Sequence, residues 1–476
     1  MFFLSIYPFI INIFYSKPNL DQYKDELLKE GTLLITGLSF PDPELIWIFP
    51  KIIILLFFSI FSILYIKRNF RIEFPIIVIL LYMLQSLLSS IFSDDSVQYI
   101  LLGGNGRMDG LIYIFSLSIL FIFSYLLIRY YDFKAANLFI FSLIFSTFLE
   151  SSIVYLQRLG YDVIGLLTVG MQYPLITGTV GNSGMVAALL LPTIILILSM
   201  LIYNKYNIYI YILYILLLIY IVGAISLTNN RASIYSILII SMIIFLFNYK
   251  YIKTYIVLII LLITIGFTPI IIPNYTQTKT RSMTNPSTLI TRLAIWNITF
   301  KIITQTKGQP FIGNGFDGLK MGIIKNKLGN EYINLYRLED GWPETVQISE
   351  LRWLHENGLS IKTDALLVYA TDSVTGKSYS GVYKVVLDKA HNLFLDKAVS
   401  TGILSAVLWI ILFIWPIWQG FLIKNNTLMS FTLSIFALLL YYQFWFPVPQ
   451  VEPIHIVILA ISWGLVYNRY FNLNTN

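Results

Sequence analysis

The sequence contains no cysteine and few charged residues. Without cysteine there can be no disulfide bond and no thiolate ligand for a metal ion, and this absence carries no information about the compartment. Charged residues make up 12% and hydrophobic residues 57% of the 476 positions, whereas a soluble domain carries about 25% charged residues. So few charges cannot cover a surface in water. The composition therefore excludes a protein that is soluble throughout and predicts lipid as its main solvent.

Several motifs of soluble enzymes are also missing. Neither a Walker A sequence nor a dinucleotide-binding fingerprint occurs, which argues against ATP as the energy source. The three histidines, His355, His391 and His455, are scattered and form no zinc motif. An acidic run at Asp94–Asp95 with Asp109 is better explained as a solvated loop than as a divalent-ion site. We expect neither a cofactor nor a metal ion.

The net charge of +7 does not indicate nucleic acid binding. The basic residues lie mainly between apolar runs, whereas a nucleic-acid site would gather them in one soluble patch. We therefore expect membrane lipids, and no nucleic acid, as partners.

Long apolar runs recur along the chain and are separated by short polar breaks. Each is long enough to cross about 30 Å of hydrocarbon as a helix. The sequence thus predicts an all-α integral membrane protein with about twelve transmembrane helices. The expected spans are 1–16, 45–66, 75–92, 111–129, 135–156, 179–203, 208–227, 232–248, 252–272, 394–422, 427–446 and 454–470.

The distribution of lysine and arginine predicts the orientation of these spans. If the N-terminus is cytoplasmic, the inside breaks carry more basic residues than the short outside breaks. The positive-inside rule therefore places both termini in the cytoplasm. Helices 1–9 then occupy residues 1–272, one large extracytoplasmic loop domain occupies 273–390, and helices 10–12 occupy 391–476.

The loop domain contains two recognisable patterns. Asn285 as N-cap and Pro286 at the first helical position predict an amphipathic helix. Its apolar stripe is expected to consist of Leu289, Leu293, Trp296, Phe300 and Ile303. Farther on, residues 365–370 and 379–387 flank a turn and predict a two-stranded β-hairpin.

Two arginines at the outer face are candidates for binding an anion. Arg231 lies between two spans with almost no loop, and Arg292 lies among apolar residues of the amphipathic helix. Each has an ordinary explanation: Arg231 as a snorkelling side chain and Arg292 as part of a solvated face. Together they would suit a phosphate, because a guanidinium is always charged and grips phosphate through two parallel hydrogen bonds.

His391 is the candidate proton acceptor. It precedes the tenth expected span, and Gly402 follows eleven residues later, on the same face if the helix is regular. A glycine there would let a neighbouring helix approach closely. Histidine suits proton transfer near neutral pH, although a histidine at a helix start also often bonds only to backbone.

Several motifs occur in an order that resembles one family. They are Gly181-Asn182, Asn230-Arg231, Arg292-Leu-Ala-Ile-Trp296, Pro310-Phe-Ile-Gly-Asn-Gly315 and His391-Asn392. Over roughly 175–420 the chain resembles the O-antigen ligase and Wzy-type polymerase superfamily of bacterial membrane glycosyltransferases. An earlier segment, Arg107-Met-Asp-Gly110, looks like the first large outer loop of that family.

The most specific of these motifs is His391-Asn392 followed after nine residues by Gly402. It is similar to the ligase signature of His-Asn, nine residues, Gly, two residues and then Gly, Thr or Tyr. Ser405 stands at the last position, so this sequence departs from the ligase pattern there while keeping the histidine and the first glycine.

The resemblance implies a metal-independent, inverting glycosyl transfer at the outer face of the bacterial plasma (inner) membrane. The donor would be a glycan linked to a polyprenyl diphosphate, and the acceptor a lipid, a glycan or a protein. Arg231 and Arg292 would bind the diphosphate, and His391 would be the general base. The supporting positions would be Asn392, Gly402, Asn182 and Arg107.

Three functions remain open from the sequence. A ligase would move a finished glycan to its acceptor, and a polymerase would use a second lipid-linked repeat as acceptor. A small-solute or inorganic-carbon transporter would instead be expected to carry charged or broken helices near the bilayer midplane. The candidate groups cluster at one face, so we favour glycosyl transfer of the ligase type. The 340–387 insertion either shapes the choice of acceptor or only covers the site.

Overall fold

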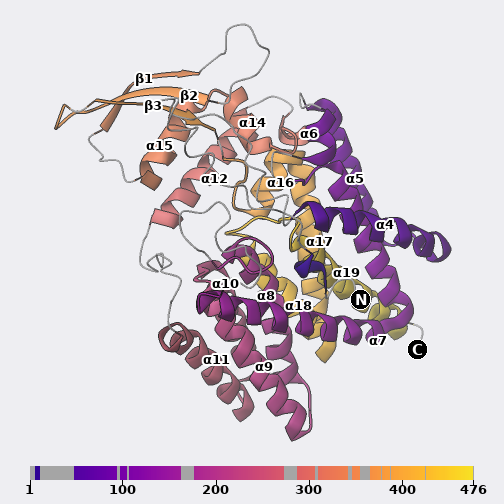
Figure 1. Ribbon diagram of the computed structural model, residues 1–476. Helices are drawn as coiled ribbons and strands as arrows, with labels where there is room; N and C mark the ends of the chain where they lie inside the picture. Colours follow the sequence, from indigo (N-terminus) through magenta and orange to yellow (C-terminus); the bar gives the residue numbers. More distant parts are fainter. Residues whose placement is uncertain are drawn as a thin grey trace.

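The computed structural model describes most of the chain. The described residues are 6–10, 48–93, 97–103, 107–161, 176–272, 287–305, 309–340, 346–353, 365–376, 378–385, 387–423 and 425–474. Over these residues the protein is mostly helical, with one small sheet at an edge of the molecule (Figure 1).

The helices have the following bounds. They are α4 Phe49–Asn69, α5 Phe74–Phe92, α6 Val97–Leu102, α7 Leu111–Arg158, α8 Ser183–Tyr203, α9 Ile208–Leu227, α10 Arg231–Asn248, α11 Ile252–Ile271, α12 Ser287–Gln305, α13 Gln309–Ile312, α14 Gly318–Lys325, α15 Gly329–Asp340, α16 Leu393–Thr401, α17 Ile403–Ile423, α18 Asn426–Tyr441 and α19 Glu452–Asn474, with a short 3-10 helix at Tyr7–Phe9.

Within the described ranges, eight helices are long and apolar enough to cross a membrane. They are α4, α5, α7, α8, α9, α10, α11 and α17. Two shorter apolar helices, α18 and Glu452–Asn468 of α19, accompany them. The protein is thus a multi-pass helical membrane protein, while the predicted number of twelve spans is not confirmed.

The predicted break between the spans 111–129 and 135–156 is confirmed, because α7 consists of two helical segments joined by a kink at Asp132 (φ 47°, ψ −131°). A single non-helical residue redirects the chain there, so no polar loop is required. Two expected spans differ from the structure. The span 394–422 is divided at Gly402 into α16 and α17, and the span 427–446 ends early, at Tyr441. The span 1–16 lies mostly outside the described residues.

Helix α8 is the centre of the bundle. Every side chain from Gly184 to Ile202 is buried, and α7, α9, α10, α11 and α18 all contact this helix. A helix that is apolar around its whole circumference is stable only when other helices surround it. Helices α10 and α18, whose ends adjoin the candidate site, pack directly on this central helix.

A polar network closes the end of the bundle away from the candidate site. Arg129 and Glu73 form an ion pair of 2.9 Å, and the Asn468 amide donates to the Asp132 carboxylate (3.1 Å). These contacts join α7 to the start of α5 and to the end of α19. They satisfy polar groups that would otherwise be costly in an apolar environment.

The predicted hairpin is confirmed and has a third strand. Strands β1 Val346–Trp353, β2 Ala365–Asp372 and β3 Ser378–Lys384 form an antiparallel sheet in the order β1-β2-β3. Strand β1 contains a register shift between Ile348 and Glu350. The shift interrupts the alternation of apolar and polar residues, which explains why the sequence did not indicate a strand there.

The amphipathic helix is confirmed as α12, while its expected cap, Asn285 and Pro286, lies outside the described residues. The expected apolar stripe is correct only in part. Ile303 is buried and Trp296 packs against the core, but Leu289, Leu293 and Phe300 are more than half exposed, and Ile298 and Ile302 are buried in their place. Apolar residues occupy both faces of α12, so periodicity alone could not choose between them. The choice is made by α14, α15 and α16, which contact the face that includes Ile302.

Gly402 is required by close backbone contact at the junction of α16 and α17. Its φ is +94° and ψ 162°, a region that is open essentially only to glycine. A Cβ atom there would lie 2.2 Å from the Phe311 carbonyl oxygen. The expected close approach at this glycine is therefore present, but the approaching element is the α13 segment, and Gly402 does not lie on a regular helix with His391.

We predict that Gly402→Ala lowers the free energy of unfolding by about 1–3 kcal/mol, because alanine is strained at this φ and meets Phe311. Gly266→Ala in α11 is the matched control, since no atom lies within 4 Å of the added methyl group. Thermal unfolding in nanodiscs measures both. Equal melting temperatures for Gly402→Ala and the wild type would contradict the strain argument.

Candidate functional site

The candidate site forms where four segments meet at one end of the bundle. These are the loop before α7, the segment leading into α16, helix α12 and the connection between α18 and α19. The segments are far apart in sequence, yet direct contacts join them: Arg107 to Asp388, and Arg292 to Phe444. The fold thus brings together residues from both halves of the chain.

His391 lies in the centre of this meeting point. Its ring lies edge-on to Phe446 (4.9 Å between ring centres) and to Trp445 (5.6 Å). Its Nδ1 atom is buried, and no hydrogen-bond partner for it occurs among the described residues. Its φ of 52° is uncommon for a residue with a side chain. An unsatisfied buried nitrogen in an unusual backbone conformation is typical of a functional position.

The surroundings of His391 favour its neutral form. Burial, together with the positive charges of Arg292 and Arg107, lowers the pKa of His391 to about 3, against an opposing effect of Asp388. At neutral pH the imidazole is therefore uncharged and can accept a proton.

Asn392 fixes the segment that carries His391. Its side-chain oxygen accepts hydrogen bonds from the Phe394 and Leu395 amides (3.0 and 3.1 Å) and so caps α16. Its side-chain nitrogen donates to Gln443. The supporting position predicted from the sequence thus links the start of α16 to the end of α18.

Arg292 points from α12 toward the same place. Its Nη1 donates to the Phe444 carbonyl oxygen, and its guanidinium lies over the Trp445 ring, 5.8 Å from the ring centre. The guanidinium therefore contributes positive charge beside His391, as the pKa of the imidazole reflects.

Arg107 joins the site from the loop before α7. It forms an ion pair with Asp388 (2.5 Å) and lies 5.0 Å from the centre of the Phe446 ring. Burial alone would raise the pKa of Asp388, but the Arg107 guanidinium holds it below its ordinary value overall. Asp388 is therefore ionised and neutralises much of the charge of Arg107.

Arg231 and Asn182 lie at the adjoining helix starts. Arg231 is the first residue of α10, directly after its cap Asn230, whose side chain bonds to Tyr441. The Tyr441 hydroxyl donates to the Gly184 carbonyl oxygen (2.7 Å), and Asn182 caps α8 at the Gly184 amide (2.7 Å). Tyr441 also lies close enough to Arg292 to interact with its charge. It is therefore a neighbour both of Arg292 and of the start of α10, where Arg231 lies.

The sequence did not identify the segment Phe444-Trp445-Phe446, which contacts three of these groups. It was included in the apolar span 427–446, but α18 ends at Tyr441. An available signal was the aromatic run followed directly by Pro447 and Pro449, because prolines favour a loop over a continuing helix.

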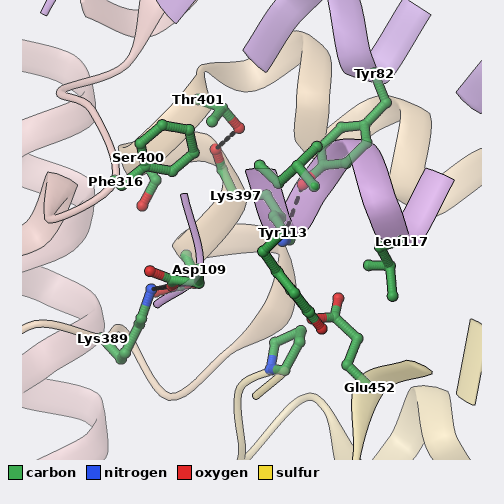
Figure 2. Close-up of a pocket in the computed structure, with 13 residues that line it drawn as sticks. Tyr82, Asp109, Tyr113, Leu117, Phe316, Lys389, Lys397, Ser400, Thr401 and Glu452 are labelled. Carbon is green, nitrogen blue, oxygen red and sulfur yellow. Dashed lines mark hydrogen bonds and ion pairs between the residues drawn. The ribbon is translucent and has the colours of Figure 1, made fainter. Parts of the chain in front are cut away.

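A buried polar chamber lies beside the site and shares two of its loops (Figure 2). Lys389 pairs with Asp109 (2.5 Å) and lies 3.8 Å from Asp396. Burial alone would lower the pKa of Lys389, but these carboxylates raise it overall, so the ammonium stays charged. The Lys389–Asp109 ion pair thus joins the 107–110 loop to the segment before His391, as the Arg107–Asp388 ion pair also does.

The chamber has room for a water molecule. Its cavity measures about 20 Å³, and a water needs roughly 10–15 Å³. Three buried lining atoms, Asp109 Oδ1, Ser400 Oγ and Glu452 Oε1, have no hydrogen-bond partner in the described part of the chain.

The charges around Asp109 also affect Asp317. Its burial, and then the nearby negative charge of Asp109, raise the pKa of Asp317 to about 6.

The site offers hydrogen-bond donors and positive charge, and it has few metal ligands. Across the residues that the structure describes, no group of three or more His, Asp or Glu side chains could hold a metal ion. Guanidinium groups beside a neutral imidazole can instead bind an anionic leaving group while a neighbouring base takes a proton.

Comparison with known proteins agrees with the motifs. Residues 216–345 match a family model described as O-antigen ligase, and this segment includes both Arg231 and Arg292 but ends before His391. Among curated proteins, none matches the chain. The family match confirms the resemblance to the O-antigen ligase superfamily over residues 216–345.

Proposed function

We propose that this protein transfers a glycan from a polyprenyl diphosphate carrier to an acceptor hydroxyl at the extracytoplasmic face of the bacterial plasma membrane. The observation that carries the proposal is the convergence of His391, Arg292 and Arg107 on one segment next to the apolar helices. The O-antigen ligase family match supports the same reaction class. Because the site adjoins apolar helices, the polyprenyl tail can stay in the lipid while the diphosphate reaches the arginines.

Arg292 and Arg231 bind the diphosphate. As the bond between the anomeric carbon and the diphosphate oxygen breaks, its electron pair stays on the diphosphate, and negative charge develops there. Guanidinium groups fixed in a site shielded from water stabilise that charge strongly. Arg107, whose charge is largely neutralised by Asp388, acts mainly by holding its loop in place.

His391 is the general base. It takes the proton of the acceptor hydroxyl as the oxygen forms a bond to the anomeric carbon, opposite the leaving diphosphate. This single displacement inverts the anomeric configuration. A base with a pKa near 3 is weak in the free enzyme. The bound diphosphate offsets the charge of Arg292 and raises the pKa at the moment when a proton must be accepted.

The acceptor is a hydroxyl group of a lipid, a glycan or a protein. The sheet β1–β3 lies within residues 340–387, the segment that either shapes the choice of acceptor or only covers the site. Incubation of the purified protein with donor alone distinguishes the two branches: chain growth indicates a polymerase, and transfer only after an acceptor is added indicates a ligase.

We predict that His391→Ala lowers kcat by about 10²–10⁴-fold, the usual contribution of a general base. Arg292→Ala and Arg231→Ala should each lower kcat/KM for the donor by about 10²–10³-fold. Lysine at either position should restore little, since it lacks the planar fork. Transfer assays in proteoliposomes measure these effects.

Lys301→Ala is the matched control for these variants. Lys301 lies on the same helix as Arg292 but forms a half-exposed ion pair with Glu331, and such pairs contribute little. Wild-type transfer by His391→Ala would remove the base assignment, and wild-type donor use by Arg292→Ala would remove its role in diphosphate binding.

The low pKa of His391 predicts an unusual pH dependence. The kcat/KM ratio reports the free enzyme, so protonation of His391 should not reduce it above about pH 5, because the imidazole is already neutral there. The kcat value reports the loaded enzyme, so its acid limb should lie at higher pH than that of kcat/KM. An acid limb of kcat/KM near pH 6.5, the ordinary value for histidine, would contradict the electrostatic account.

The orientation, with both termini cytoplasmic, is tested by single cysteines, since the chain contains none. Val374 in the turn between β2 and β3 is 74% exposed, and Tyr209 at the start of α9 is 81% exposed. A membrane-impermeant maleimide should label Val374→Cys in intact spheroplasts and should label Tyr209→Cys only after lysis. The reverse pattern would show that the site faces the cytoplasm.

A further inference from the structure

The pair of rings at Trp445 and Phe446 has a function of its own. We infer that Trp445 and Phe446 are positioning residues, which hold the guanidiniums of Arg292 and Arg107 and the His391 ring in one fixed arrangement before substrate binds. This inference rests on the proposed function and identifies what organises its site.

The geometry joins the five side chains through the two rings. The Trp445 and Phe446 rings are nearly parallel, with an angle of 8° and 5.4 Å between their centres. Arg292 lies over Trp445 at 5.8 Å, and Arg107 lies over Phe446 at 5.0 Å. The His391 ring meets both rings edge-on, at 70° and 76°. Each charged group of the cluster therefore contacts an aromatic ring.

Such an arrangement addresses a physical difficulty of the site. Two guanidiniums beside one imidazole repel each other, and each long side chain loses about 2 kcal/mol of rotamer entropy when it is fixed. An aromatic face attracts a cation by roughly 0.5–2 kcal/mol. Asp388 pairs with Arg107, and the Phe444 carbonyl oxygen accepts a hydrogen bond from Arg292. The rings add a flat face against each guanidinium, so the cations are held in place before the substrate anion binds. The diphosphate then meets a site that is already ordered.

The rings are themselves held rigidly. A Cβ atom on Gly184 of α8 would lie 2.7 Å from the Trp445 ring, so this ring rests directly on the central helix. Phe446 is 4% exposed. On the other side, Trp296 of α12 contacts Phe444 with 6.0 Å between ring centres. The three-residue segment is thus clamped between α8 and α12.

The indole nitrogen of Trp445 contributes no hydrogen bond. Its Nε1 is buried without a partner among the described residues, so the ring faces carry the interaction. Another flat ring should therefore replace the indole. This distinguishes a positioning role through the aromatic face from a role as hydrogen-bond donor.

The central experiment keeps the shape of the ring and weakens its attraction for cations. Phe446 is replaced by phenylalanine analogues carrying one, two and three ring fluorines, which withdraw charge from the aromatic face without removing the side chain. We expect kcat/KM for the donor to fall stepwise with each fluorine, to about tenfold below wild type in total. The pH at which kcat/KM falls on the acid side should also change, because the Arg107 charge affects the pKa of His391 and is then held less firmly.

Conventional variants provide rescue and control. Trp445→Leu and Phe446→Leu should raise KM for the donor and lower kcat by about tenfold or more, whereas Trp445→Phe and Phe446→Tyr should stay within about threefold of wild type. Trp418→Leu is the matched control, because Trp418 on α17 is 62% exposed. Its kinetics should be those of the wild type.

The outcomes separate this inference from the proposed function. Wild-type kinetics across the fluorinated series, with His391→Ala inactive, would overturn the positioning role and leave the glycosyl transfer intact. Wild-type transfer by His391→Ala would instead overturn the base assignment. Should the leucine variants fail to fold, the fluorinated series still decides, because it preserves packing. Equal loss in Trp445→Phe and Trp445→Leu would also contradict the inference.

Discussion

The contact of two guanidiniums with the Trp445–Phe446 ring pair is the constraint on which the site depends. It allows positive charge to accumulate beside an uncharged imidazole, at the boundary of an apolar helix bundle where unpaired charges are costly. Because the Trp445 ring rests on α8, whose side chains are buried all round, the core of the protein sets the position of the Arg292 charge. The Arg107–Asp388 and Lys389–Asp109 ion pairs then attach the loop before α7 to the segment that carries His391.

Much of the fold could be predicted from the sequence, and the candidate site residues could be named from it. Most of the helices could be located from the length of the apolar runs, since a helix that crosses lipid must be long and continuous. The rarity of charge in such a chain made Arg231, Arg292 and His391 conspicuous, and the structure brings His391 and Arg292 together. The family match over 216–345 confirms the resemblance. The chemical roles of these residues remain proposals.

The errors have physical reasons that a one-dimensional pattern cannot contain. Hydropathy does not record backbone angles, so the positive φ of Gly402 was invisible, and the span around it was drawn wrongly. Periodicity could not choose between the two apolar faces of α12, because its neighbours decide which face is buried. Phe444–Phe446 counted as membrane-spanning residues, since an aromatic side chain that holds a cation has the same hydropathy as one that faces lipid.

The central claim is that one diphosphate binds where Arg292 and His391 meet. The most direct measurement is a cryo-EM structure of the full chain in nanodiscs with a polyprenyl diphosphate bound. The account predicts diphosphate density within hydrogen-bonding distance of the Arg292 guanidinium, with the prenyl chain running into lipid and the His391 ring facing the same cavity. Diphosphate density at another end of the bundle, or a bound state in which Arg292 and His391 share no cavity, would contradict it.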